Sequence, residues 1–213
     1  ALIPTDTAVS TYALIRDETA ERKAATFLLG DNLERTTQGG GIYTYTSQQG
    51  AAAFRDTGSF DAAGSLSQEN AEAFCRDFCK AFSYDTPIFT LDETGSGTAT
   101  AVRLWSGTPV FNAAVTFTID QGRVLSASGA LLPETGAETS SGQKPLSAFA
   151  ALTAFQQMRH ASSSVVSSIT EVSLCYELQS TTAAPMALVP SWRIVTDTAT
   201  FYVNCISGTV RRA

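Results

Sequence analysis

The sequence has a single histidine, few basic residues and no long hydrophobic run. One histidine, His160, excludes a metal site made of several imidazoles and leaves a histidine-dependent triad with one candidate. A net charge of −6 argues against a nucleic-acid surface, because such a surface needs clustered Lys and Arg. The longest apolar runs, such as residues 51–54 and 148–152, are far shorter than the roughly 20 residues of a membrane helix.

The chain begins Ala1-Leu2-Ile3-Pro4, without a methionine. We expect that a signal peptide or an N-terminal membrane anchor preceded this start, so that the folded part lies outside the cytoplasmic membrane. A composition rich in Thr, Ser and Ala and poor in Lys agrees with that location. The alternative is a cytosolic domain that was trimmed at its N-terminus.

The residues that most often carry chemistry all have a simpler structural interpretation. Cys75 and Cys79 lie on the apolar side of a predicted helix, and His160 lies in the last turn of another, where a cation meets the negative end of the helix dipole. Three aspartates fall at predicted turns, which favour Asp for local hydrogen bonding: Asp92, Asp120 and Asp197. We therefore expect no catalytic residue, metal or cofactor, although a hydrolase with an unrecognised site stays open as an alternative.

Hydrophobic periodicity predicts an α+β protein of repeated helix-plus-antiparallel-meander units, with curved sheets that helices cover on one side. Residues 1–64 are predicted to hold a helix over residues 7–29, ended by Gly30, and a hairpin over residues 42–56.

The first complete unit is predicted over residues 65–132. Ser65 or Ser67 is expected to cap its helix, and one apolar stripe recurs at helical spacing: Ala71, Phe74, Cys75, Phe78 and Phe82. Four strands follow, over residues 87–91, 98–105, 110–119 and 123–131. The third strand alternates most clearly, with these residues on one face: Phe111, Ala113, Val115, Phe117 and Ile119.

A polar linker, residues 133–144, separates this unit from a second one over residues 145–213. The second helix is predicted from Pro145 to about His160, with Phe149, Leu152 and Phe155 on its buried side. Strands follow over residues 165–178, 187–196, 200–206 and 209–211. The shared order of elements indicates an internal duplication of pattern, with low identity between the copies.

Two further cysteines lie in strands of this second unit. The alternation of Cys175 with its neighbours places it away from their apolar side, whereas Cys205 shares the apolar face of Phe201 and Val203. We therefore predict that Cys175 and Cys205 form no disulfide with each other.

The C-terminal motifs resemble a known group of proteins. Residues 188–195 (LVPSWRIV) contain a P-x-W-x-I strand, and residues 201–210 (FYVNCISGTV) contain Y-V-N-x-x-x-G-x-V. This order is similar to the end of the extracytoplasmic regulators YycH and YycI, and its second half is similar to PepSY-type domains. The hairpin that begins with Pro109-Val110-Phe111 resembles a hairpin of the same group.

The resemblance implies a non-enzymatic domain, anchored by an N-terminal helix absent here, that modulates a membrane sensor histidine kinase through protein contacts. A PepSY-like inhibitor or propeptide-type module acting on a secreted peptidase is the second interpretation. The partner is expected to be another protein, with no nucleic acid involved. Arg103, Arg193 and exposed tyrosines are the candidate partner-binding residues, because Arg and Tyr often anchor interfaces.

Overall fold

The computed structural model of the chain describes residues 9–67, 70–139, 144–162, 166–180 and 184–213. These residues form an α+β fold in which one large, open sheet is covered by three helices: α1 (Glu18–Leu29), α2 (Ala71–Ala81) and α3 (Ala148–Ser162). None of the helices in these parts of the chain combines the length and the apolar character needed to cross a membrane. The predicted fold class, with helix-plus-meander units, is confirmed.

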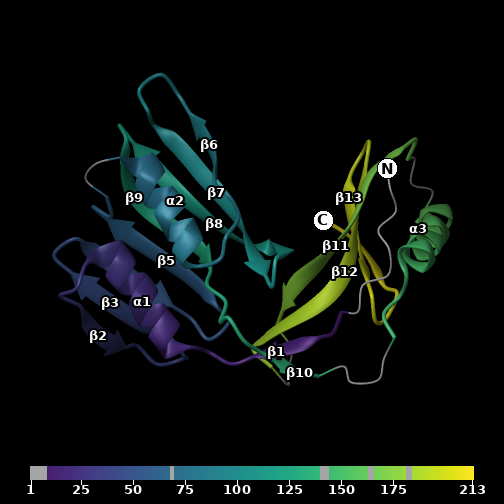
Figure 1. The fold of residues 1–213 in the computed structure, drawn as a ribbon, viewed down its shortest axis with the longest axis horizontal. Coiled ribbons are helices and arrows are strands. Elements are labelled where there is room, and N and C mark those ends of the chain that lie inside the picture. Colours follow the sequence, from purple (N-terminus) through teal and green to yellow (C-terminus); the bar gives the residue numbers. More distant parts are fainter. Residues whose placement is uncertain (1–8, 68–69, 140–143, 163–165, 181–183) are drawn as a thin grey trace.

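The first two helices share one sheet. After α1 come β2 (Glu34–Thr37), β3 (Tyr43–Ser47), β4 (Gly50–Phe54) and β5 (Ser59–Gly64). After α2 come β6 (Ile88–Leu91), β7 (Gly97–Trp105), β8 (Thr108–Asp120) and β9 (Arg123–Ala130). Each set pairs antiparallel in sequence order, and β5 pairs with β9. Both helices lie on the same face of the resulting eight-stranded sheet (Figure 1).

The third helix belongs to a C-terminal sheet. After α3 come β11 (Ile169–Gln179), β12 (Met186–Thr196), β13 (Thr200–Asn204) and β14 (Val210–Arg212), again paired antiparallel in sequence order. The short strand β1 (Tyr12–Leu14) pairs with β12 and with β10 (Ala137–Glu138). The helix α3 lies on the side of this sheet that faces away from the eight-stranded sheet (Figure 1).

A bulge in β8 joins the two sheets. Val102 of β7 pairs with Ala114, but the next residue, Arg103, pairs with Val110, so residues 111–113 have no partner on β7. Before the bulge, Val110 pairs with Arg103 of β7 on one side and in parallel with Tyr176 of β11 on the other. An apolar cluster fills this junction: Leu14, Trp105, Val110, Ala113, Ala130, Leu132, Tyr176, Met186 and Leu188.

The side chain of Asn112, inside the bulge, extends this junction. Its Nδ2 donates to the carbonyl of Leu178 at 2.7 Å, and its Oδ1 accepts the N–H of Leu178 at 2.8 Å. A side-chain amide has the same donor and acceptor as a peptide group. Asn112 therefore pairs with β11 as a backbone residue would.

The helix α2 is amphipathic as predicted, but it begins later. Asn70, not Ser65 or Ser67, is its N-cap, and the Asn70 side chain accepts the N–H of Ala73 at 3.1 Å. Ala71, Cys75, Phe78 and Phe82 are buried and Phe74 packs against them, so the predicted stripe is confirmed.

The N-terminal prediction is wrong before residue 18, and residues 1–8 lie outside the described residues. Asp17 caps α1 by accepting the N–H groups of Thr19 and Ala20 at 2.9 and 3.0 Å. The preceding residues are extended because Tyr12 to Leu14 pair with β12. The end of α1 at Leu29, before Gly30, is as predicted.

Candidate functional site

The four cysteines are buried free thiols. Burial raises the pKa of Cys75, Cys79 and Cys205 to about 12, and it also raises the pKa of Cys175. Thiolates are the reactive form of cysteine, so none of these groups is prepared as a nucleophile at neutral pH.

The register of the C-terminal sheet places two of these thiols on opposite faces. Cys175 pairs with Ser191, whereas the N–H of Cys205 donates to the carbonyl of Pro190, the neighbouring residue on β12. Successive residues of a strand point to opposite faces. The face assignment made from the sequence is thus reproduced, and the predicted lack of a disulfide between them stays a prediction.

The carboxylates singled out at turns are engaged by the fold: Asp92 bonds within its own turn, whereas Asp197 bonds to the segment that precedes β11. Asp92 accepts the N–H groups of Thr94 and Ser96 at 2.8 and 3.0 Å, and Asp197 accepts the N–H of Ser167 at 3.1 Å. The hydroxyl of Thr94, with these backbone donors, lowers the pKa of Asp92. Within the described residues no three His, Cys, Asp or Glu side chains gather as metal ligands.

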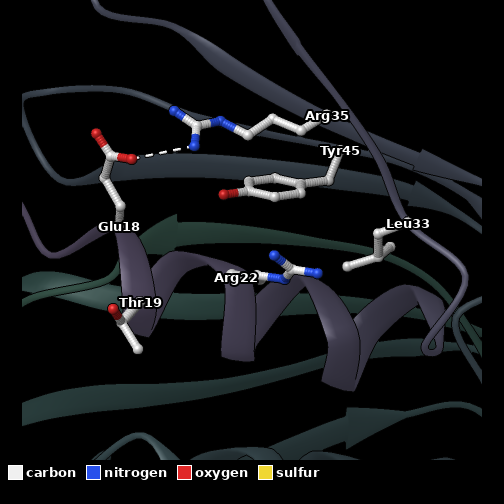
Figure 2. Close-up of a pocket in the computed structure, with 6 residues that line it drawn as sticks. All are labelled: Glu18, Thr19, Arg22, Leu33, Arg35 and Tyr45. Carbon is white, nitrogen blue, oxygen red and sulfur yellow. Dashed lines mark ion pairs between the residues drawn. The ribbon is translucent and has the colours of Figure 1, made fainter.

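A pocket of about 290 Å³ lies between the start of α1 and strands β2 and β3 (Figure 2). Both oxygens of the Glu18 carboxylate are engaged there, one by Arg35 at 3.0 Å and the other by the hydroxyl of Tyr43 at 3.0 Å. The ring of Tyr43 in turn lies between the guanidinium groups of Arg35 and Arg16, at 3.8 and 3.9 Å. These contacts tie β2 and β3 to α1, so we interpret the pocket as a structural feature.

Arg103, the first candidate partner-binding residue, is fully buried. The prediction that it is an exposed anchor is therefore wrong. Its Nη1 donates to the carbonyls of Ser83 and Leu104 at 2.7 and 3.0 Å. Its Nη2 donates to the carbonyl of Leu132 at 3.1 Å and pairs with Glu134 at 2.9 Å. Arg103 therefore fixes three chain segments at the β8 bulge. Its alternation with Ala99, Ala101 and Trp105, all buried, was the sequence signal for this position.

The second candidate anchor, Arg193, is half-buried on the face of the C-terminal sheet opposite α3. Its side chain pairs with Glu171 at 2.8 Å and lies over the ring of Phe111 at 4.4 Å. Phe111 belongs to the β8 bulge, so Arg193 contacts both sheets. The bulge also explains why Phe111 is only half-buried although Ala113, with which it was predicted to share a face, is fully buried. A partner-binding role of Arg193 stays a prediction.

Phe149 is the residue whose burial was predicted incorrectly and whose exposure matters most for the site. It was expected on the buried side of its helix, but 76% of it is exposed. The helix begins at Ala148 instead of Pro145, and Ala148, Ala151 and Phe155 form the buried stripe. Phe149 is about 100° away from Ala148 around the helix and points outward.

The outer face of α3 also differs from those of the other helices. From residue 148 to residue 158 the helix has no charged residue. By contrast, α1 and α2 each carry four charged residues, and most of these are exposed: Glu18, Glu21, Arg22 and Lys23 in α1, and Glu72, Arg76, Asp77 and Lys80 in α2. We call the exposed residues Phe149, Thr153, Gln156 and Gln157 the α3 face.

Three solved structures resemble this chain over nearly its whole length. An uncharacterized protein from Eubacterium rectale has a TM-score of 0.51 at 13% identity, over 96% of this chain and 81% of its own. The C-terminal domain of YpeB from Bacillus megaterium has a TM-score of 0.44 at 13% identity, over 94% and 98% of the two chains. YycH from Bacillus subtilis has a TM-score of 0.43 at 13% identity, over 99% of this chain and 52% of its own.

No protein-family model matches the sequence, and no curated protein matches it. YycH, which the C-terminal motifs resemble, is among the matched structures, and this chain spans about half of its length. At this level of identity the similarity concerns the fold and not the function, and the fold is that of the Eubacterium rectale protein.

Proposed function

We propose that this chain is a non-enzymatic, protein-binding regulatory domain that acts outside the cytoplasmic membrane, and that its partner docks on the α3 face. The observation that carries the proposal is the exposed ring of Phe149 on a helix surface without charge. Aromatic residues are enriched and charged residues depleted at the centre of protein–protein interfaces, and this surface has one exposed ring among uncharged polar side chains.

The energetics favour Phe149 as the centre of such an interface. Covering a Phe side chain completely contributes roughly 1.5 to 3 kcal/mol. Aromatic residues near the middle of an interface are frequent hot spots, and the neutral Thr153 and Gln156 beside Phe149 add no charge that must be desolvated. The α3 face is accordingly suited to a partner surface that is apolar at its centre and polar at its rim.

The chemistry-bearing groups support a role without catalysis. The thiols are buried with raised pKa values, and Asp92 and Asp197 are engaged by backbone N–H groups. A nucleophile or an acid–base pair needs a free group within reach of substrate and a base near it. These residues instead hold the fold together.

The resemblance of the C-terminal motifs to YycH and YycI supports a sensor histidine kinase as the partner. In this proposal the extracytoplasmic domain of the kinase contacts the α3 face, and an N-terminal membrane anchor keeps the two proteins together. Tethering raises the effective concentration of the partner, so a modest intrinsic affinity is sufficient.

Isothermal titration calorimetry tests this proposed contact. The purified chain is titrated with the extracytoplasmic domains of sensor kinases from its organism. We expect one of them to bind, and Phe149→Asp to weaken binding at least about thirtyfold, since it places a charge at an apolar centre. Leu125→Asp is the matched control, because Leu125 is an exposed apolar residue of β9 in the other sheet. Wild-type affinity of Phe149→Asp, or no binding to any kinase domain, would overturn the proposal.

A further inference from the structure

Four strands border the sheet in the described parts of the chain, each with a neighbour on one side only: β2, β6, β10 and β14. Exposed edge strands usually carry charges that prevent pairing with other chains. Glu34 and Arg35 serve this purpose in β2, Arg211 and Arg212 in β14, and Glu138 in the two-residue β10. The sequence of β6 is Ile-Phe-Thr-Leu, without charge, and 75% of Ile88 is exposed.

The hydrogen bonds of the β6–β7 hairpin determine which groups of β6 face outward. The N–H of Asp92 donates to the carbonyl of Ser96 at 2.9 Å, so Asp92 and Ser96 form a hydrogen-bonded pair. In an antiparallel ladder every second residue pair is hydrogen-bonded in this way. Thr90 and Ile88 are therefore bonded to β7, opposite Thr98 and Thr100. The N–H and C=O groups of the intervening Phe89 and Leu91 point away from the sheet.

These outward groups fit a second β6 strand in one antiparallel register. With Thr90 opposite Thr90 of the other copy, Phe89 of each copy lies opposite Leu91 of the other. All outward N–H and C=O groups of the two residues are then bonded in two reciprocal pairs. Each pair also places an aromatic ring beside an aliphatic side chain, which is a favourable cross-strand contact. The arrangement has two-fold symmetry, as isologous dimers do.

The charges at the two ends of β6 are complementary in the same register. Before β6, two cations of α2, Arg76 and Lys80, line a pocket of about 360 Å³ together with Pro87 and one acid, Asp85. After β6 come two acids, Asp92 and Glu93, both exposed. When the two-fold register is continued beyond β6, Glu93 of one copy, at the β6–β7 turn, comes near Pro87 of the other copy and the pocket that holds its Lys80. The dimer contains this contact twice.

We propose that a second copy of this chain pairs antiparallel along β6, with the Phe89–Leu91 contacts at the centre and Glu93 beside Lys80 at each end. The two eight-stranded sheets then form one continuous sheet. The contact is separate from the α3 face, so a dimer leaves both α3 faces open.

Sedimentation equilibrium between about 1 µM and about 1 mM protein tests the dimer. We expect twice the monomer mass at the upper end. Leu91→Pro removes an outward N–H without removing a bond to β7, and it should raise the dimer dissociation constant at least about tenfold. Lys80→Glu and Glu93→Lys should each weaken the dimer by roughly three- to tenfold, and the double swap should restore it.

Glu34→Lys, on the β2 edge, is the matched control and should leave the dissociation constant unchanged. Circular dichroism confirms that each variant is folded. A wild-type chain that stays monomeric up to about 1 mM would overturn the proposal and leave β6 for a strand of a different protein. A dimer that survives Leu91→Pro, or that the double swap does not restore, would overturn it as well.

Discussion

The helices α2 and α3 both cover a sheet, but their solvent-facing surfaces differ in charge. Each covers an antiparallel meander that follows it in the chain, and each buries one stripe. The outer side of α2 carries Glu72, Arg76, Asp77 and Lys80, whereas the outer side of α3 is neutral and presents Phe149. Packing on a sheet therefore leaves the outer surface unspecified, and we propose that the two regions differ in function at that surface.

The inner surfaces differ as well. The rings of α1 and α2 form a continuous network in which Phe27 contacts Phe74, Phe78 and Phe82, with ring centroids 5.2 to 6.1 Å apart. The buried stripe of α3 consists of alanines and Phe155, whose ring lies 5.0 Å from that of Phe201. The core beneath α3 is therefore built with fewer aromatic side chains than the core beneath α1 and α2.

The two arginines singled out from the sequence provide the largest contrast between the regions. Arg103→Met removes three hydrogen bonds to backbone carbonyls and the ion pair with Glu134 from a fully buried position, and we expect it to lower the free energy of unfolding by about 3 to 5 kcal/mol. Arg193→Met removes an ion pair with the half-exposed Glu171 and should cost about 1 kcal/mol or less. Urea denaturation measures both. Similar losses for the two variants would contradict the assigned positions.

Two phenylalanines of α3 test which side of the helix faces the sheet. Phe155→Ala should lower the free energy of unfolding by about 3 to 5 kcal/mol because it opens a cavity against Phe201. Phe149→Ala should change it by less than about 0.5 kcal/mol, since the ring is mostly exposed. Chemical denaturation of the matched pair distinguishes them. A large loss for Phe149→Ala would show that this ring packs within the folded chain.

A substitution at Asn112 tests the junction between the two sheets, and we expect it to change the free energy of unfolding by a smaller amount. Asn112→Ala removes both hydrogen bonds to Leu178 and should lower the free energy of unfolding by about 1 to 2 kcal/mol. It should also accelerate hydrogen exchange of the Leu178 amide. Thr118→Ala, at an exposed position of the same strand, is the control and should leave both quantities nearly unchanged. Unaltered exchange at Leu178 in Asn112→Ala would contradict the pairing.

The sequence predicted the elements whose side chains alternate clearly. From Ala113 to Ile119, β8 buries every second residue, and the stripe of α2 recurs every three or four residues. It missed β2 because Glu34 to Thr37 are polar and exposed at an edge, without an apolar face to reveal a strand. It missed β1 because three residues carry no period, and their conformation depends on pairing with the distant β12.

The candidate site was harder to predict than the fold. In α3 the segment AFAALTAF is apolar on every side, so its periodicity does not distinguish the buried ring of Phe155 from the exposed ring of Phe149. Arg103 was expected at the surface because charged residues are seldom buried, and its carbonyl partners, on Ser83, Leu104 and Leu132, are brought together by the tertiary fold and not by a local sequence pattern.

The shared order of a helix followed by a meander bears on whether the chain contains internal duplications. Each of α1, α2 and α3 is followed by four strands that pair in sequence order. We infer that these segments are copies of one unit, and we propose boundaries at residues 1–64, 65–132 and 145–213. The copies then differ in their cores and in their helix surfaces, as the comparison of α2 and α3 illustrates.

The most direct test of function by surface contact is a signalling assay in cells that carry the full-length protein and its partner kinase. We expect kinase output to be unchanged by His160→Ala, Cys75→Ala and Asp92→Ala, and to respond to Phe149→Asp as it responds to deletion of the protein. Loss of signalling in a correctly folded His160→Ala or Asp92→Ala protein, with Phe149→Asp fully active, would contradict the account.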